Sequence, residues 1–289
     1  MVCMKKTTKK CKIRGVFAIG LAAAVFIFNG ACAKKTDGMS SKVLSGVEGK
    51  QVLKVGATPE PHAEMLKLIS KDLQNEGVRL EIIEFTDYVT PNAALGSGQI
   101  DANFFQHIPY LQSFNEEQGT HLVSAGGVHI EPLALYSKKY SALEQLSDGA
   151  VIAIPNDPTN EGRSLLLLQS AKLIRLKENA GITATPADIA ENPKKLKFRE
   201  IEAASLPRVL ADTDAAVING NYAIPAGLSA AQNGLFVEGS DSPYVNVVAV
   251  KKENENDERI AALMQALRSE KIAAFIAERY PNGEVVKVF

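Results

Sequence analysis

Residues 151–168, VIAIPNDPTNEGRSLLLL, decide the fold that we expect for this chain. The β-branched run at 151–154 predicts a short buried strand, and the turn-forming residues that follow it predict a tight loop. Thr159 or Asn160 is then expected to cap a helix whose apolar body is 165–168. A strand that leads through a loop into a helix is the unit of an α/β fold, and the first helical turn offers free N–H groups to an anion.

Arg163 lies in the first turn of this predicted helix. The helix dipole disfavours a cation at that end unless an anion is also present, and a guanidinium can bind a carboxylate with two parallel hydrogen bonds. The position therefore predicts a ligand that carries an anionic group. The alternative is a solvated Arg163, or one that pairs with Glu161 or another acid.

Strand and helix patterns alternate on both sides of this stretch, and the extended run at 122–137 is the expected crossing between two lobes. We therefore predict an α/β protein with two mainly parallel sheets and a ligand cleft beyond the carboxyl ends of the strands. Lobe 1 is expected to comprise 50–137 plus 243–289, and lobe 2 to comprise 138–242. The predicted strands are 52–57, 78–85, 101–105, 151–154, 196–201, 215–218 and 245–250. One predicted helix begins at Pro61, and the others span 89–95, 109–117, 160–176, 206–211 and 257–280.

The first 31 residues have the composition of a signal peptide. They hold six basic side chains and no acid, and the apolar run at 16–28 is shorter than the roughly 20 residues that a membrane-spanning helix needs. The small residues before Cys32 resemble a lipobox, although Asn29 stands where a lipobox usually has an apolar residue.

Cys32 is the expected lipidation site, because Cys3 and Cys11 are removed with the leader. Acyl chains such as palmitate would anchor the protein at the bacterial cell membrane, facing the periplasm or the outside. Residues 32–49 are polar and rich in Gly and Ser, so we expect them to form a flexible tether behind the lipid. The alternative is an ordinary secreted protein that is cleaved after Ala31.

Composition and motifs argue against several classes of function. Removal of the six basic leader residues changes the formal charge from −1 to −7, and no basic stripe with interleaved aromatics predicts nucleic-acid binding. Motifs for a nucleophile elbow, a zinc protease or a phosphate loop are missing, so we predict neither an enzyme nor a cofactor. Two rival functions stay open, a surface adhesin role and metal binding. His107, His121, His129 and Glu131 fall within 25 residues but lack a metal-ligand spacing, so no metal site is predicted.

Aromatic and amide side chains gather at the predicted strand ends. We expect Phe105 to line a pocket and Phe104, its neighbour on the opposite face, to enter the core. His107 either caps the next helix or joins the pocket. Two amides, Asn219 and Asn246, offer donors and acceptors that suit a zwitterion, and turn formation is the alternative for each.

The chain resembles the methionine-binding lipoproteins that supply an ATP-driven methionine importer, over about residues 52–289. The resemblance implies a two-lobed periplasmic-binding-protein fold that closes over free L-methionine and then docks on a permease and ATPase complex. Some similar proteins bind a methionine-containing dipeptide, so that ligand, or another amino acid, is the alternative. The motifs that carry the resemblance are VGATPEPHAEML at 55–66, FTDYVTPNAAL at 85–95, DANFFQHIPYL at 101–111, EPLALYSKKY at 131–140, AIPNDPTNEGRSLLLLQ at 153–169, AVING at 216–220 and DSPYVN at 241–246.

The same resemblance implies roles for individual residues. Arg163 corresponds to the residue that binds the ligand carboxylate, with Asn160 close by, and Asn219 and Asn246 correspond to positions that hold the amino-acid head group. The positions that surround the ligand side chain are Tyr88, Phe105 and His107, and the resemblance extends to Phe104 and Tyr110.

Overall fold

The computed structural model of this chain describes residues 51–239 and 242–289. The predicted signal peptide, Cys32 and the tether at 32–49 lie outside the described residues. Within the described ranges, no helix has both the length and the apolar character needed to cross a membrane.

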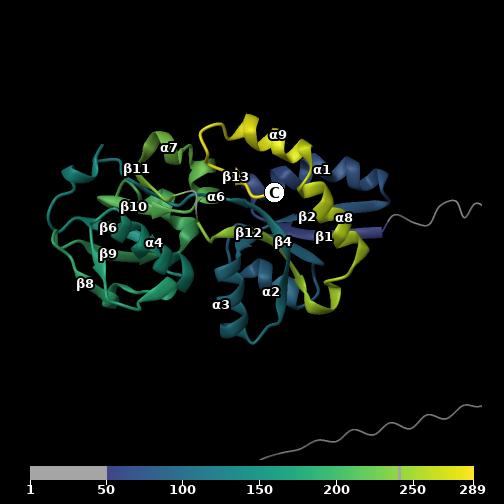
Figure 1. The fold of residues 1–289 in the computed structure, drawn as a ribbon, viewed down its shortest axis with the longest axis horizontal. Coiled ribbons are helices and arrows are strands. Elements are labelled where there is room, and N and C mark those ends of the chain that lie inside the picture. Colours follow the sequence, from purple (N-terminus) through teal and green to yellow (C-terminus); the bar gives the residue numbers. More distant parts are fainter. Residues whose placement is uncertain (1–50, 240–241) are drawn as a thin grey trace, which may run out of the picture. The chain divides into compact units, whose positions relative to one another are not determined.

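The first lobe is built on a six-stranded sheet that unites the beginning and the end of the described chain (Figure 1). Strands β1 and β2 and strands β1 and β3 pair in parallel, whereas β12 runs antiparallel to both β3 and β4. The order across the sheet is β13 (Val286–Lys287), β4 (Leu122–Ile130), β12 (Val245–Lys251), β3 (Ala102–His107), β1 (Gln51–Ala57) and β2 (Val78–Glu84).

Helices cover both faces of this sheet. On one face α1 (Glu64–Asn75) buries a stripe that includes Leu66 and Ile69 against β1 and the C-terminal helices. On the other face α2 (Thr90–Gly96) and α3 (Ile108–Gln118) close a smaller apolar cluster.

The single helix expected at 257–280 is instead two helices, α8 (Glu258–Leu267) and α9 (Glu270–Arg279), because Ser269 adopts an extended conformation and begins the second one. The helix expected from Pro61 starts with a short irregular turn, η1 (Pro59–Ala63).

The second lobe is built on a five-stranded sheet. Its strands β6, β9 and β10 are parallel and β5 is antiparallel to both its neighbours. The order is β11 (Gly234–Val237), β5 (Ala134–Tyr136), β10 (Ala215–Ile218), β6 (Val151–Pro155) and β9 (Lys197–Ile201). Helices α4 (Pro158–Ser170), α5 (Leu206–Val209), α6 (Gly220–Ala223) and α7 (Ala230–Asn233) and a two-stranded ribbon of β7 (Arg175–Leu176) and β8 (Ile189–Glu191) complete it. The predicted α/β fold with two lobes is confirmed. The sheets, expected to be mainly parallel, are mixed, because β12, β13 and β4 in the first sheet and β11 and β5 in the second pair in antiparallel fashion.

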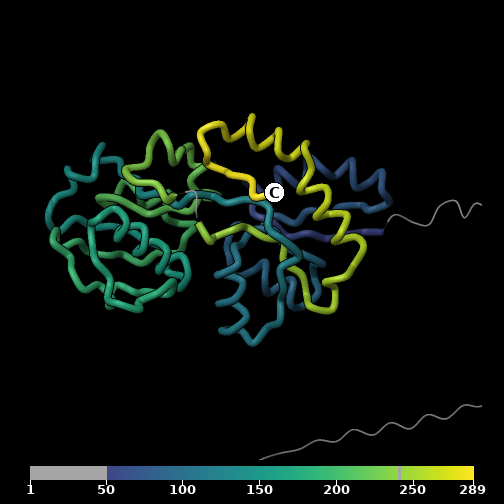
Figure 2. Tube along the Cα trace, in the orientation of Figure 1, coloured from purple at the N-terminus to yellow at the C-terminus, as the bar shows by residue number. Residues whose placement is uncertain are grey.

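The chain passes twice between the sheets, and Figure 2 traces both passages. The first lies between β4 and β5, at residues 131–133, and the second lies between β11 and β12, where the structure describes residues 238–239 and 242–244. The predicted boundary at residue 137 comes after β5, a strand that already pairs in the second sheet. We call these two segments the crossing segments.

Candidate ligand-binding site

Residues from both lobes line one cavity. Its walls come from the carboxyl ends of β3 and β10, the first turns of α4 and the start of β12. Every predicted ligand-binding residue except Phe104 is in this wall: Tyr88, Phe105, His107, Tyr110, Asn160, Arg163, Asn219 and Asn246.

The two lobes contact each other directly around the cavity. The Tyr88 hydroxyl donates to Asn221 Oδ1 at 2.5 Å, and Tyr222 donates to the carbonyl oxygen of Thr86 at 3.1 Å. The rings of Tyr88 and Tyr222 also lie 5.0 Å apart. These contacts join the two lobes beside the aromatic residues of the cavity.

Arg163 is almost completely buried, with 3% of its surface exposed, and it is held on three sides. Its Nε donates to Glu238 at 2.9 Å, its Nη2 donates to Glu238 and to the carbonyl oxygen of Glu131, and its guanidinium lies 4.2 Å from the centre of the Tyr244 ring. Among the described residues, nothing accepts a hydrogen bond from Nη1. Arg163 therefore pairs with an acid other than Glu161, namely Glu238, which is one of the alternatives that the sequence left open. Its Nη1 atom stays available to donate a hydrogen bond to a ligand.

The start of α4 differs in detail from the prediction. Asp157, and not Thr159 or Asn160, caps the helix, because its extended backbone places the carboxylate to accept the Asn160 N–H at 3.0 Å. Burial raises the pKa of Asp157, and the hydrogen bonds from Asn160 oppose this shift. Asn160 donates its amide to the same carboxylate and accepts from Asn219 at 2.7 Å, so it serves as a fixed support for the cavity wall.

His107 combines both of its predicted roles. It caps α3 by accepting the Tyr110 N–H on Nδ1 at 3.1 Å, and its Nε2 lies 3.2 Å from Asn160 Oδ1 across the lobes. Accepting on Nδ1 leaves the proton on Nε2, which defines a neutral ring. Burial and the neighbouring Arg163 lower the pKa of His107 to about 3, consistent with that state.

Aromatic rings form the opposite end of the cavity. The ring centres of Tyr88, Phe105 and Tyr110 lie 5.8–5.9 Å from one another. Phe104 points the other way, is fully buried in the core of the first lobe and lies 4.6 Å from the ring of His62. The strand alternation of β3 explains why neighbouring phenylalanines separate in this way.

Four further residues line the cavity that the sequence did not single out as ligand-binding: Gln106, Glu131, Gly220 and Asn221. Asn221 and Asn219 each carry a buried polar atom without a hydrogen-bond partner in the described residues, Nδ2 of Asn221 and Oδ1 of Asn219. Unpaired polar atoms are costly in a protein interior, and at a cavity wall they indicate where a polar ligand binds. The sequence signal for them was the amide pair around Gly220.

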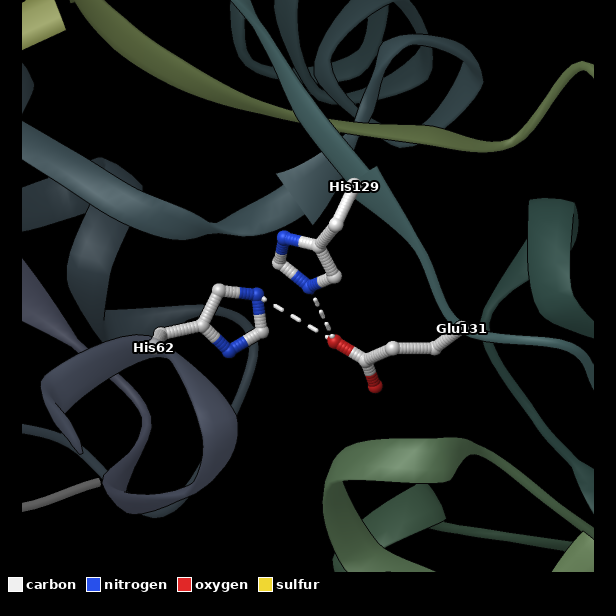
Figure 3. A group of neighbouring side chains, drawn as sticks. All are labelled: His62, His129 and Glu131. Atoms are coloured by element: carbon white, nitrogen blue, oxygen red, sulfur yellow. Dashed lines mark hydrogen bonds and ion pairs between the residues drawn. The ribbon is translucent and has the colours of Figure 1, made fainter. Parts of the chain in front are cut away.

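Behind the cavity, three residues of metal-binding type meet in the buried cluster His62, His129 and Glu131 (Figure 3). Their candidate ligand atoms lie within 4.8 Å of one another. Glu131 Oε1 lies 2.8 Å from His129 Nε2 and 3.4 Å from His62 Nε2. The sequence analysis overlooked His62, and the other two histidines that it considered, His107 and His121, are not part of this cluster.

The family model described as NlpA lipoprotein matches residues 53–289. The chain belongs to the NlpA lipoprotein family. Among the relatives of this NlpA lipoprotein, the membrane lipoprotein TpN32 of Treponema pallidum is 48% identical over 231 residues, which cover 80% of this chain and 86% of the relative. The D-methionine-binding lipoprotein MetQ of Escherichia coli K12 is 45% identical over 227 residues, 78% of this chain and 83% of the relative.

Solved structures of similar proteins share the fold. A nutrient binding protein from Burkholderia cenocepacia bound to methionine matches this NlpA lipoprotein with a TM-score of 0.80 and 46% identity, over 82% of this chain and all of the other. The lipoprotein Tp32 from Treponema pallidum matches with a TM-score of 0.81 and 46% identity, over 83% of this chain and all of the other.

Proposed function

We propose that this lipoprotein captures methionine as a free amino acid in the cavity between its lobes and delivers it to an ATP-driven importer in the membrane. The observation that carries the proposal is the cavity itself, which has one available guanidinium nitrogen at its polar end and three aromatic rings at the other. The names of its relatives, which include methionine-binding and D-methionine-binding proteins, agree with this ligand.

The polar end favours a zwitterion over a simple anion. Glu238 already balances the charge of Arg163, so the site offers only a partial excess of positive charge to a ligand carboxylate. Nη1 of Arg163 and Nδ2 of Asn221 are donors, and Oδ1 of Asn219 is an acceptor. A free amino acid supplies groups of both kinds, whereas a fully deprotonated oxyanion such as sulfate supplies only acceptors.

The aromatic end of the cavity favours a thioether side chain. Contacts between a sulfur atom and the edges of Tyr88, Phe105 and Tyr110 contribute roughly 0.3–1.5 kcal/mol each. A methionine-containing dipeptide, the alternative, needs a wider opening of the lobes.

The transport step rests on the same geometry. A ligand that touches Arg163 in the second lobe and Tyr88 in the first lobe favours the form in which the lobes contact each other. That form is the one we expect the permease to recognise, while the lipid on Cys32 keeps the protein at the membrane. In this role the protein binds its ligand and performs no catalysis.

Calorimetric titration tests the proposal. The full chain is purified in detergent, freed of ligand by mild unfolding and refolding, and titrated with L-methionine, D-methionine and glycyl-methionine. We expect methionine to bind, and Arg163→Ala to lose most of that affinity. Arg175→Ala is the matched control, because Arg175 is an exposed arginine of the same lobe that pairs with Glu191 away from the cavity. No binding of any methionine ligand by the unmodified protein would refute the proposal.

A further inference from the structure

Tyr244 is a buried aromatic residue that contacts Arg163 without lining the ligand cavity. Its exposed fraction is 3%, and the guanidinium of Arg163 lies over its ring, 4.2 Å from the ring centre. The ring centre of Tyr244 also lies 5.0 Å from that of His107, with the two rings edge to face. Both Arg163 and His107 line the cavity, whereas Tyr244 does not. Tyr244 therefore packs against two residues of the cavity wall from outside the cavity.

Tyr244 is attached to the first lobe, although the guanidinium that it contacts comes from the second. It is the last residue of the second crossing segment, because β12 begins at the next residue. Within β12, Asn246 pairs with His107 of β3, which fixes the start of this strand to the first sheet. Arg163 lies in α4 of the second lobe. The contact between Tyr244 and Arg163 therefore joins the two lobes at the guanidinium.

Two kinds of contact hold this guanidinium, and they restrain different movements. A guanidinium is planar, and its N–H groups donate within that plane. Glu238 accepts from Nε and Nη2, and the carbonyl oxygen of Glu131 accepts from Nη2, so these hydrogen bonds fix the orientation within the plane. An aromatic ring over the plane opposes a tilt out of it, and the negative face of the ring attracts the cation.

The ring of Tyr244, and not its hydroxyl, is the part that contacts Arg163. The hydroxyl oxygen is buried and has no hydrogen-bond partner within residues 51–239 and 242–289. A buried hydroxyl without a partner costs free energy, so it contributes nothing that explains a tyrosine here. A phenylalanine ring in the same place should therefore hold Arg163 equally well.

Resting on the proposed function, we propose that Tyr244 is a positioning residue for Arg163, and that its ring holds the guanidinium with Nη1 oriented for the ligand carboxylate. Without the ring, the guanidinium keeps its hydrogen bonds to Glu238 but tilts more freely, and its bond to the ligand weakens. Ligands without a carboxylate do not depend on this orientation. The preference for a carboxylate is then set in part by a residue that the ligand does not touch.

The test compares two ligands that differ only at the carboxyl group. L-Methionine and L-methioninamide are titrated calorimetrically into the full chain at about pH 6, where the amino group of either ligand is charged. In the unmodified protein we expect methionine to bind on the order of 100-fold more tightly, because the amide lacks the charge that pairs with Arg163. In Tyr244→Leu this ratio should fall by about tenfold, which is the scale of a buried cation–π contact. Tyr244→Phe retains the ring and should keep the ratio within about threefold.

A second tyrosine that contacts an arginine provides the matched control. Tyr280 is a buried residue of the first lobe whose ring centre lies 5.4 Å from the guanidinium of Arg279, and it does not line the cavity. Tyr280→Leu should lower the melting temperature and leave the ligand ratio unchanged. If Tyr244→Leu does not fold, Tyr244→Met takes its place, because methionine keeps an apolar side chain of similar length without a flat ring.

The ligand ratio separates this inference from the proposed function. If Tyr244→Leu weakens the binding of both ligands by the same factor, the ring supports only the fold, and the inference is overturned while methionine binding stands. If Tyr244→Phe lowers the ratio as much as Tyr244→Leu does, the hydroxyl carries the effect, and the inference is again overturned. A failure of the unmodified protein to bind either ligand overturns the proposed function, and the inference with it.

Discussion

The contacts of Arg163 make its removal a test of both binding and stability. Arg163→Ala deletes the paired hydrogen bonds to Glu238, one hydrogen bond to Glu131 and the contact with the Tyr244 ring. Breaking a buried ion pair costs about 3–5 kcal/mol, and since the Glu238 side chain is still 16% exposed we expect a loss of unfolding free energy near 3 kcal/mol. Methionine binding should weaken by about 2–5 kcal/mol, or at least roughly 30-fold, because the ligand carboxylate loses its charge partner.

A second substitution separates the two effects. Glu238→Gln removes the charge that Arg163→Ala leaves unpaired, so the double variant should recover about 1–2 kcal/mol of the lost unfolding free energy. It should not recover methionine binding, because Nη1 is still missing. Urea denaturation of ligand-free protein measures the first quantity and calorimetric titration measures the second.

Two results would refute this reasoning. If Arg163→Ala binds methionine within threefold of the unmodified protein, the ligand carboxylate lies elsewhere. If the double variant recovers binding along with stability, Arg163 contributes to affinity only through the fold, and its available nitrogen has no role.

Three further predictions concern the cavity and the buried histidines. Gly220→Ala should weaken methionine binding at least tenfold, since its Cβ would collide with Glu131, and calorimetric titration measures this. Phe104→Leu should lower the melting temperature and leave methionine affinity within about threefold, whereas Phe105→Leu should do the reverse. Buried neutral histidines bind protons less readily than the unfolded chain does, so each destabilises the fold as pH falls below about 6.5. In His129→Phe, the free energy of unfolding, measured by urea denaturation from pH 6.5 to 4, should therefore fall less steeply, by roughly 1.4 kcal/mol per pH unit.

Local patterns were sufficient to predict most of the fold. The strand at β6 and the helix start at α4 follow from a short apolar run and turn formers, and both lie where the sequence places them. Details that depend on backbone angles were less predictable. Asp157 caps α4 because the helix begins at Pro158, one residue before the expected cap position. The break between α8 and α9 at Ser269 is marked in the sequence only by a single cap-forming residue.

The site was predictable only where its residues lie within motifs. Arg163 and Phe105 were found from their own segments, but the partner of Arg163 is Glu238, 75 residues away. No spacing rule reaches that far. The cluster of His62, His129 and Glu131 was unpredictable for the same reason, because packing between η1 and β4 brings together two histidines that are far apart in the sequence. One signal was available: the two-residue spacing of His129 and Glu131 puts both on one side of an extended chain.

Both crossing segments contribute a carboxylate to the site, and this links ligand binding to the connection between the lobes. Glu131 begins the first segment and Glu238 begins the second, and the two segments are joined by hydrogen bonds between Leu133 and Glu238. Arg163 binds both segments at once, through the carbonyl oxygen of Glu131 and the side chain of Glu238. A ligand whose carboxylate binds Nη1 of Arg163 therefore contacts the side chain that joins both crossing segments. Closure of the lobes and recognition of the ligand carboxylate thus depend on the same few hydrogen bonds, and a ligand that lacks the carboxylate loses its contact with the residue that joins the crossing segments.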